Sequence, residues 1–148
     1  MKPDVDRLLE VAAGQLMTKL GPALPTSFEQ ATGMSLGVLL LSVREEMERG
    51  AQRRVEENGV LRALFAQAAP AVPDAALRER LESAARNEDP SLAISDLESA
   101  NAALRGLLIE LHACVEELDS PEASRIEEAI WSELVVSTER RKLAFAFF

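Results

Sequence analysis

Residues 94–118 read ISDLESANAALRGLLIELHACVEEL and carry an apolar heptad repeat, which is the clearest signal in this chain. With the heptad written abcdefg, position d holds Leu97, Leu104, Leu111 and Leu118, and position a holds Ile94, Asn101, Leu108 and Val115. A seven-residue repeat keeps one stripe of a helix against a neighbouring helix over its whole length. The sequence therefore predicts a protein in which helices pack lengthwise on one another.

The composition predicts the same fold class. Of the 148 residues, 47% are hydrophobic and 28% are charged, and the chain has no tyrosine. Alanine, leucine, glutamate and arginine dominate over the β-branched residues, which favours helix over sheet. The length suits one domain. We therefore predict an all-α protein, a single helical-bundle domain over residues 1–148, with five or six antiparallel helices joined by short connections.

Capping and breaking residues divide the chain into these helices. Asp4, Thr26 or Ser27, Asp74, Asp89 and Ser120 are well placed to accept hydrogen bonds from the first amides of a helix. Gly21-Pro22 and Asn58-Gly59 are typical breaks. The expected helices are 5–20, 27–57, 60–69, 74–86, 90–118 and one from 121 towards the C-terminus.

The second helix is expected to be central, because residues 34–43 are apolar nearly all round. Gly33 and Gly37 lie on one face of it. They either let another backbone come close or are tolerated defects that cost about 1 kcal/mol each. The charged residues that follow, 44–57, suggest that the helix continues into solvent.

The charge distribution argues against several kinds of partner. The formal charge is −9, and residues 71–148 hold 8 basic and 16 acidic side chains. An acidic half repels phosphate backbones and anionic lipids, so we expect neither nucleic acid nor membrane as a partner. The N-terminus lacks the apolar stretch of a signal peptide, and the single cysteine, Cys114, fits a reducing compartment. We expect a cytoplasmic protein.

The heptad helix can pack within the chain or between two chains. Position g holds Ala100, Leu107 and Cys114, and this widens the apolar stripe beyond that of a two-stranded zipper. The wide stripe favours an intramolecular core over a dimer seam, although a mixture of both stays open. Asn101 is polar at an a position. It either fixes the register of packing or lies near the helix end with its amide in water.

The sequence offers little for reaction chemistry. The single histidine, His112, has Ile109 three residues before it, so the Glu-x-x-His pairs of a di-iron bundle are missing. Cys114 is two residues from His112 on the same helix, and the two side chains therefore point apart. A carboxylate-only cation site stays open, from the glutamates at 45, 46, 98, 110 and 117. We expect no catalytic residues, no bound metal and no cofactor.

The C-terminal phenylalanines Phe145, Phe147 and Phe148 need an apolar environment. They either fold back to complete the core or dock into a neighbouring subunit or partner protein, since large exposed apolar patches tend to mark interfaces.

Two stretches resemble an uncharacterised family of small all-helical bacterial proteins, often encoded beside aminoglycoside-phosphotransferase-like kinases and acyl-CoA dehydrogenases. They are Leu24-Pro25 with Phe28, leading into the helix that reaches Arg44-Glu45, and residues 142–146, KLAFA. The family often has an Arg and an Asn where this chain has Ala31 and Ser35. The resemblance covers about a fifth of the chain. It implies an accessory role beside such enzymes and no catalytic residues to transfer.

These observations favour a non-catalytic helical interaction or accessory protein, acting as a homo-oligomer or with a partner protein. Asn101 and the three C-terminal phenylalanines are the candidate interaction residues. The alternative is a bundle that binds a small apolar or acyl ligand between its helices, with Asn101 or a nearby carboxylate to orient it.

Overall fold

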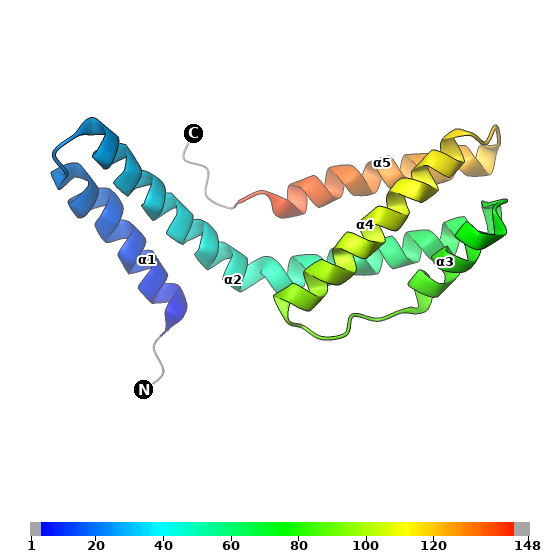
Figure 1. Ribbon diagram of the computed structural model, residues 1–148, viewed down its shortest axis with the longest axis horizontal. Helices are drawn as coiled ribbons and strands as arrows, with labels where there is room; N and C mark the ends of the chain where they lie inside the picture. Colours follow the sequence, from blue (N-terminus) through cyan, green and yellow to red (C-terminus); the bar gives the residue numbers. More distant parts are fainter. Residues whose placement is uncertain (1–3, 144–148) are drawn as a thin grey trace. The chain divides into compact units, whose positions relative to one another are not determined.

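A computed structural model describes residues 4–143 of the chain and confirms the all-α fold class (Figure 1). The described part contains five α-helices, one π-helical turn, two short 3-10 helices and no strand. Its contacts divide it into two compact units, one built on residues up to 50 and the other on residues 51–142. Compact units can belong to one domain, so the single-domain prediction stays a prediction. Each unit is described by itself.

The first unit is a helical hairpin. Helix α1 (Val5–Gln15) continues through a π turn, η1 (Leu16–Leu20), into a 3-10 helix, η2 (Gly21–Ala23). Helix α2 (Ser27–Ala68) follows and contributes its N-terminal part to the hairpin. Thr26 caps α2 in a reciprocal pattern: its hydroxyl accepts from the Glu29 amide at 3.2 Å, and the Glu29 carboxylate accepts from the Thr26 amide at 3.1 Å.

The two arms of the hairpin are antiparallel and approach through small residues. At the open end, the Arg44 guanidinium donates to both oxygens of Asp6, at 2.5 and 3.1 Å. Nearer the turn, a Cβ added at Gly33 would lie 2.9 Å from the Cα of Gly21, and one added at Gly37 would overlap the Met17 side chain. Gly33 therefore allows the close approach of another backbone and Gly37 that of the Met17 side chain, and the interpretation as tolerated defects is wrong.

The second unit, here the core unit, holds the C-terminal part of α2, η3 (Ala69–Ala71), α3 (Ala75–Arg86), α4 (Ile94–Glu116) and α5 (Pro121–Arg141). Figure 1 shows α3, α4 and α5 gathered around that part of α2. Consecutive helices α4 and α5 are antiparallel, because Asn101 contacts Arg141 and His112 contacts Trp131. Asp74 and Ser120 cap α3 and α5 as predicted.

The heptad helix packs within the chain. Leu97, Leu104 and Leu111 at d are all buried, and so are Leu108 and Val115 at a. Leu107 at g is also buried, as the wide stripe predicted. Except for Leu97, these side chains share one apolar cluster with residues of the other three helices, including Phe65, Leu81 and Ile130. The intramolecular interpretation of the heptad is therefore supported over an exclusive dimer seam.

Three local predictions are wrong. Helix α2 runs without a break through Asn58-Gly59, because Asn58 is fully buried and makes side-chain hydrogen bonds while Gly59 keeps helical geometry. Asp89 does not cap a helix at Pro90, because its carboxylate accepts from Arg62 and Asn58; α4 begins only at Ile94. The stretch 44–57 does not end in solvent, since both Arg53 and Glu57 are buried.

Candidate functional site

A buried polar network crosses the core unit where α2, α4 and α5 meet. Its centre is a pair of amides: the Asn101 side chain donates to the Asn58 side-chain oxygen at 2.9 Å. Asn58 and Asn101 are 0% and 1% exposed. The Asn101 oxygen accepts from Arg141 at 3.2 Å. The alternative with the Asn101 amide in water is therefore wrong, and the residue aligns α4 against α2.

Glu57 supplies the negative charge of this network. Its carboxylate accepts from Arg105 at 2.5 Å and from Arg141 at 2.9 Å, and Arg105 also donates to the Ser137 hydroxyl. Burial raises the pKa of Glu57, but the hydrogen bonds from Arg141 and Arg105 outweigh burial and hold the pKa below its ordinary value. Glu57 is thus ionised at neutral pH and stabilises two arginines from two other helices.

Asp89 closes the other end of the network. The Asn58 amide donates to Asp89 at 2.9 Å and Arg62 donates to the same oxygen at 2.7 Å. Burial raises the pKa of Asp89, and the hydrogen bonds from Arg62 and Asn58 lower it by more. Apart from the Arg62 Nε, which is buried without a hydrogen-bond partner, the donors and acceptors described here satisfy one another, so the arrangement suits a structural role better than reaction chemistry.

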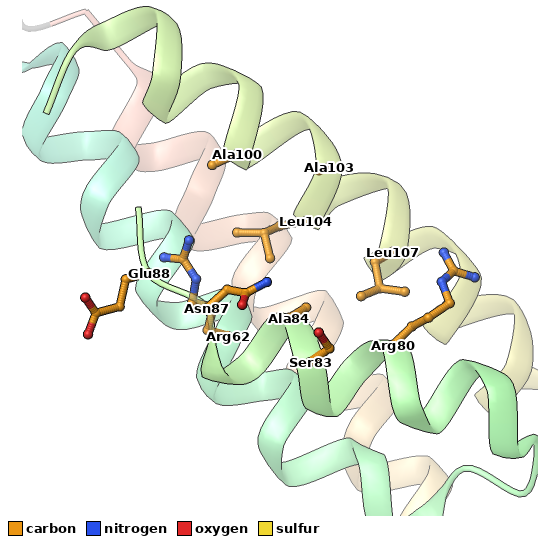
Figure 2. A pocket seen from close by; sticks show the side chains of 10 residues that line it. All are labelled: Arg62, Arg80, Ser83, Ala84, Asn87, Glu88, Ala100, Ala103, Leu104 and Leu107. Atoms are coloured by element: carbon orange, nitrogen blue, oxygen red, sulfur yellow. The ribbon is translucent and has the colours of Figure 1, made fainter. Parts of the chain in front are cut away.

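A pocket of about 370 Å³ lies beside this network, between α3 and α4 (Figure 2). Leu104 and Leu107 line its apolar side, with Arg62 and Arg80 near its rim. Both arginines are held by carboxylates: Arg62 by Asp89 at 2.7 Å, and Arg80 by Glu110 at 2.6 and 2.7 Å. Their charge is largely neutralised, which weakens the pocket as an anion site.

A second hollow contains the single thiol of the chain. Cys114 lines it together with Asp74, Glu110 and Glu117. Burial raises the pKa of the Cys114 thiol, and the negative charges of Asp74 and Glu117 raise it further. Because the thiolate is the nucleophile, the raised pKa lowers the reactivity of Cys114 at neutral pH.

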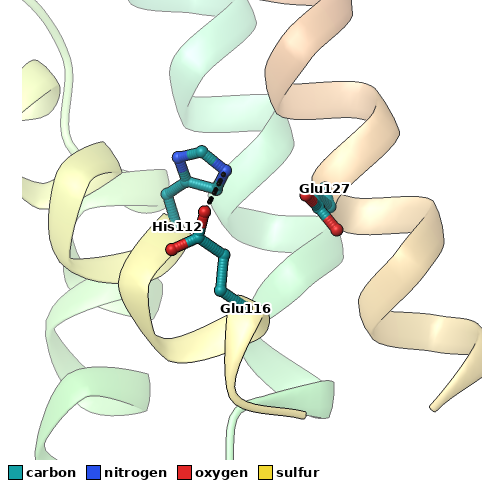
Figure 3. A group of neighbouring side chains, drawn as sticks. All are labelled: His112, Glu116 and Glu127. Carbon is teal, nitrogen blue, oxygen red and sulfur yellow. Dashed lines mark ion pairs between the residues drawn. The ribbon is translucent and has the colours of Figure 1, made fainter. Parts of the chain in front are cut away.

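One group of side chains in the described part of the chain has the composition of a metal site. It consists of His112 and Glu116 on α4 and Glu127 on α5 (Figure 3). One ligand atom from each lies within 4.8 Å of the other two. No spacing in the sequence indicates this group, because Glu127 is fifteen residues from His112 and only the antiparallel packing of α4 and α5 brings the two together.

The hairpin unit presents a large apolar surface. Five α2 side chains at helical spacing form what we call the outer stripe, and each is 45–82% exposed: Phe28, Leu36, Leu39, Val43 and Met47. On α1, Val5, Leu8 and Val11 are also about half exposed. The expectation that this helix is central and covered nearly all round is not met within residues 4–143, since Leu36, Leu39 and Val43 are exposed there.

Of the interaction residues proposed from sequence, Asn101 lies in the polar network and lines none of the pockets described here. Phe145, Phe147 and Phe148 lie outside the described residues. Sequence reasoning did not identify Glu57 or Asn58. The only feature of the sequence that pointed to these partners was Asn101 at a core position of the heptad, because a buried amide needs a polar or charged partner on a facing helix.

No protein-family model, no curated protein and no solved structure matches this chain. None of the described helices is both long and apolar enough to cross a lipid bilayer.

Proposed function

We propose that the protein is a non-catalytic helical interaction protein, and that it associates with a second copy of itself through the hairpin unit. The observation that carries the proposal is the exposed outer stripe of α2. Phe28 is 82% exposed, Leu39 59% and Val43 55%. Scattered exposed apolar residues are ordinary, but several of them aligned on one face of a helix are typical of an interface.

A pair of helices cannot bury its apolar surface by itself. Here the arms of the hairpin meet through glycine and alanine, and the small residues Ala13, Gly21, Gly33 and Gly37 are buried. Small residues bring the backbones close but remove little apolar area from water. The larger side chains therefore stay outside, where a further helix layer is needed to cover them.

A second copy of the hairpin fits this need. Residues 30–43 contain no charged side chain, and residues 1–50 hold only 5 basic and 7 acidic ones. Two such surfaces do not repel each other strongly, unlike the acidic remainder of the chain. Two hairpins related by a twofold axis form a four-helix bundle, the common way in which two-helix units complete a core.

The mass of the full chain in solution tests the proposal. Light scattering after size-exclusion chromatography is expected to give twice the chain mass of 16.1 kDa. Leu39→Glu places a charge in the outer stripe and is expected to shift the protein to the single-chain mass at the same concentration. The matched control is Ile109→Glu, because Ile109 is a 70% exposed apolar residue on α4, outside the hairpin.

The two variants separate association from folding. Both side chains are exposed, so the helical circular-dichroism signal should stay unchanged in each. A wild-type mass of 16.1 kDa across the accessible concentration range contradicts the proposal. So does a Leu39→Glu protein that keeps the double mass.

The alternative, a site for a small apolar or acyl ligand, is favoured by one feature of the core unit. A pocket of about 360 Å³ is lined by Leu64, Ile126 and Ala129, with Arg125 at the same site to meet a carboxylate. This volume is at the lower end for ligand sites. A ligand role predicts that medium-chain fatty acids raise the melting temperature, and that Ala129→Leu, which fills the pocket, abolishes the rise.

A further inference from the structure

We propose that His112, Glu116 and Glu127 bind one divalent transition-metal ion of the zinc type. His112 and Glu116 are one helical turn apart on α4, and Glu127 faces them from α5. Figure 3 shows the three side chains converging on one space between the two helices. The proposal concerns the core unit and is independent of the association through the hairpin.

The spacing of the three ligand atoms suits a small cation. In a tetrahedral zinc site with ligands at about 2.1 Å, neighbouring ligand atoms are roughly 3.4 Å apart. The Nε2 atom of His112 and a carboxylate oxygen of Glu116 are 3.6 Å apart. The remaining distances are at most 4.8 Å, and rotation of the Glu116 and Glu127 side chains, neither of them fully buried, closes the difference.

A second, independent observation is the state of the His112 ring. Its Nε2 atom is shielded from solvent but has no hydrogen-bond partner. The Glu116 oxygen at 3.6 Å is too far away for a hydrogen bond. A shielded polar atom without a hydrogen bond costs free energy, and a bound metal ion removes that cost. The ring is already held in place, because Trp131 packs edge-to-face against it with the ring centres 5.2 Å apart.

The donor set selects the class of metal. One imidazole nitrogen and two carboxylate oxygens suit zinc and its neighbours in the first transition row, whereas calcium and magnesium prefer oxygen ligands alone. Two carboxylates also balance the charge of a divalent ion. Three protein ligands leave the fourth tetrahedral position for a water molecule, as in open zinc sites.

Trp131 provides a local probe, since it is the only tryptophan in the chain. The full-length protein, freed of metal with chelator, is titrated with cobalt chloride while tryptophan fluorescence is recorded. Because Trp131 contacts His112, a bound paramagnetic cobalt ion is expected to quench the fluorescence in a saturable manner, at one ion per chain. Excess zinc chloride should restore it by displacement, and magnesium chloride should not.

Variants of the ligands make the test specific. Glu127→Gln, which leaves the His112–Trp131 contact in place, is expected to weaken cobalt binding at least about tenfold, since even outer-shell partners contribute that much. His112→Gln should abolish the quenching. The control is Glu128→Gln, the same charge change at an exposed neighbour on α5. Absence of saturable quenching, or equal affinity in Glu127→Gln and Glu128→Gln, overturns the proposal.

Discussion

Replacing Asn101 by leucine tests the role of the polar network most directly, because the heptad pattern and the structure predict opposite changes in the free energy of unfolding. By the heptad pattern alone, leucine at an a position should stabilise the helix packing. In the structure, Asn101 is 1% exposed and joins Asn58 to Arg141. We expect Asn101→Leu to destabilise the core unit.

The magnitude follows from what the leucine leaves behind. The Asn58 side-chain oxygen loses its donor while 0% exposed, and a buried acceptor without a partner costs about 1–3 kcal/mol. Forcing a larger branched side chain into a packed polar site adds about 1–3 kcal/mol. Burial of the leucine itself contributes about 1.5–3 kcal/mol in the opposite direction. The net loss in the free energy of unfolding is about 1–2 kcal/mol.

Urea unfolding followed by Trp131 fluorescence measures this loss in the core unit, because the only tryptophan lies in α5. The control is Ala102→Leu, an exposed neighbour on α4, for which we expect a change within about 0.5 kcal/mol. In the double variant Asn58→Ala/Asn101→Leu the orphaned acceptor is gone. Its loss should therefore fall short of the sum of the single losses by about 1 kcal/mol.

Two results refute this reasoning. The first is an Asn101→Leu protein as stable as the wild type or more stable. The second is a strictly additive double variant, which means that the two amides do not interact.

Two further predictions concern the charge of the network and the hairpin. Glu57→Gln is expected to lower the free energy of unfolding by about 2 kcal/mol at neutral pH. Because folding lowers the pKa of Glu57, the stabilisation by its carboxylate is complete above the ordinary pKa of 4.5 and is lost as the pH falls below that value. The difference in unfolding free energy between variant and wild type should therefore shrink towards pH 3, and a constant difference contradicts the assignment. Gly33→Ala is expected to increase hydrogen exchange in α1, because the added Cβ meets the Gly21 backbone. Gly37→Ala should increase the exchange less, because its Cβ meets the flexible Met17 side chain. Gly14→Ala, whose Cβ would have nothing within 4 Å, should slow the exchange by favouring helix.

Local signals in the sequence were sufficient for most helix ends. Asp4, Asp74 and Ser120 each cap the helix predicted from them, because a cap needs only its own first turn. The heptad repeat of α4 also predicted correctly which face of the helix is buried. Its wide stripe predicted several neighbours rather than one, and the burial of Leu107 confirms that.

The wrong predictions of helix ends arise where residues distant in the sequence determine the local structure. Asn58-Gly59 is a break by composition, but inside α2 the Asn58 side chain finds Asp89 and Asn101 on other segments of the chain, and these bonds keep the helix continuous. Asp89 was expected to cap a helix for the same local reasons. It binds Arg62 instead, and no spacing rule connects two residues 27 positions apart.

The two units are stabilised by different kinds of contact, and this difference supports the proposal that the chain associates through the hairpin unit. In the core unit, Asn58 can meet Asn101, and Glu57 can meet Arg105, only in one alignment of α2 with α4. A slip by one heptad would leave Glu57 buried without Arg105, so the network favours one packing arrangement. The hairpin has the reverse character. Its arms meet through glycines, many of its large apolar side chains are exposed, and residues 30–43 are uncharged. From this contrast we infer that the core unit folds on contacts it already contains, whereas the hairpin gains most of its stability by association.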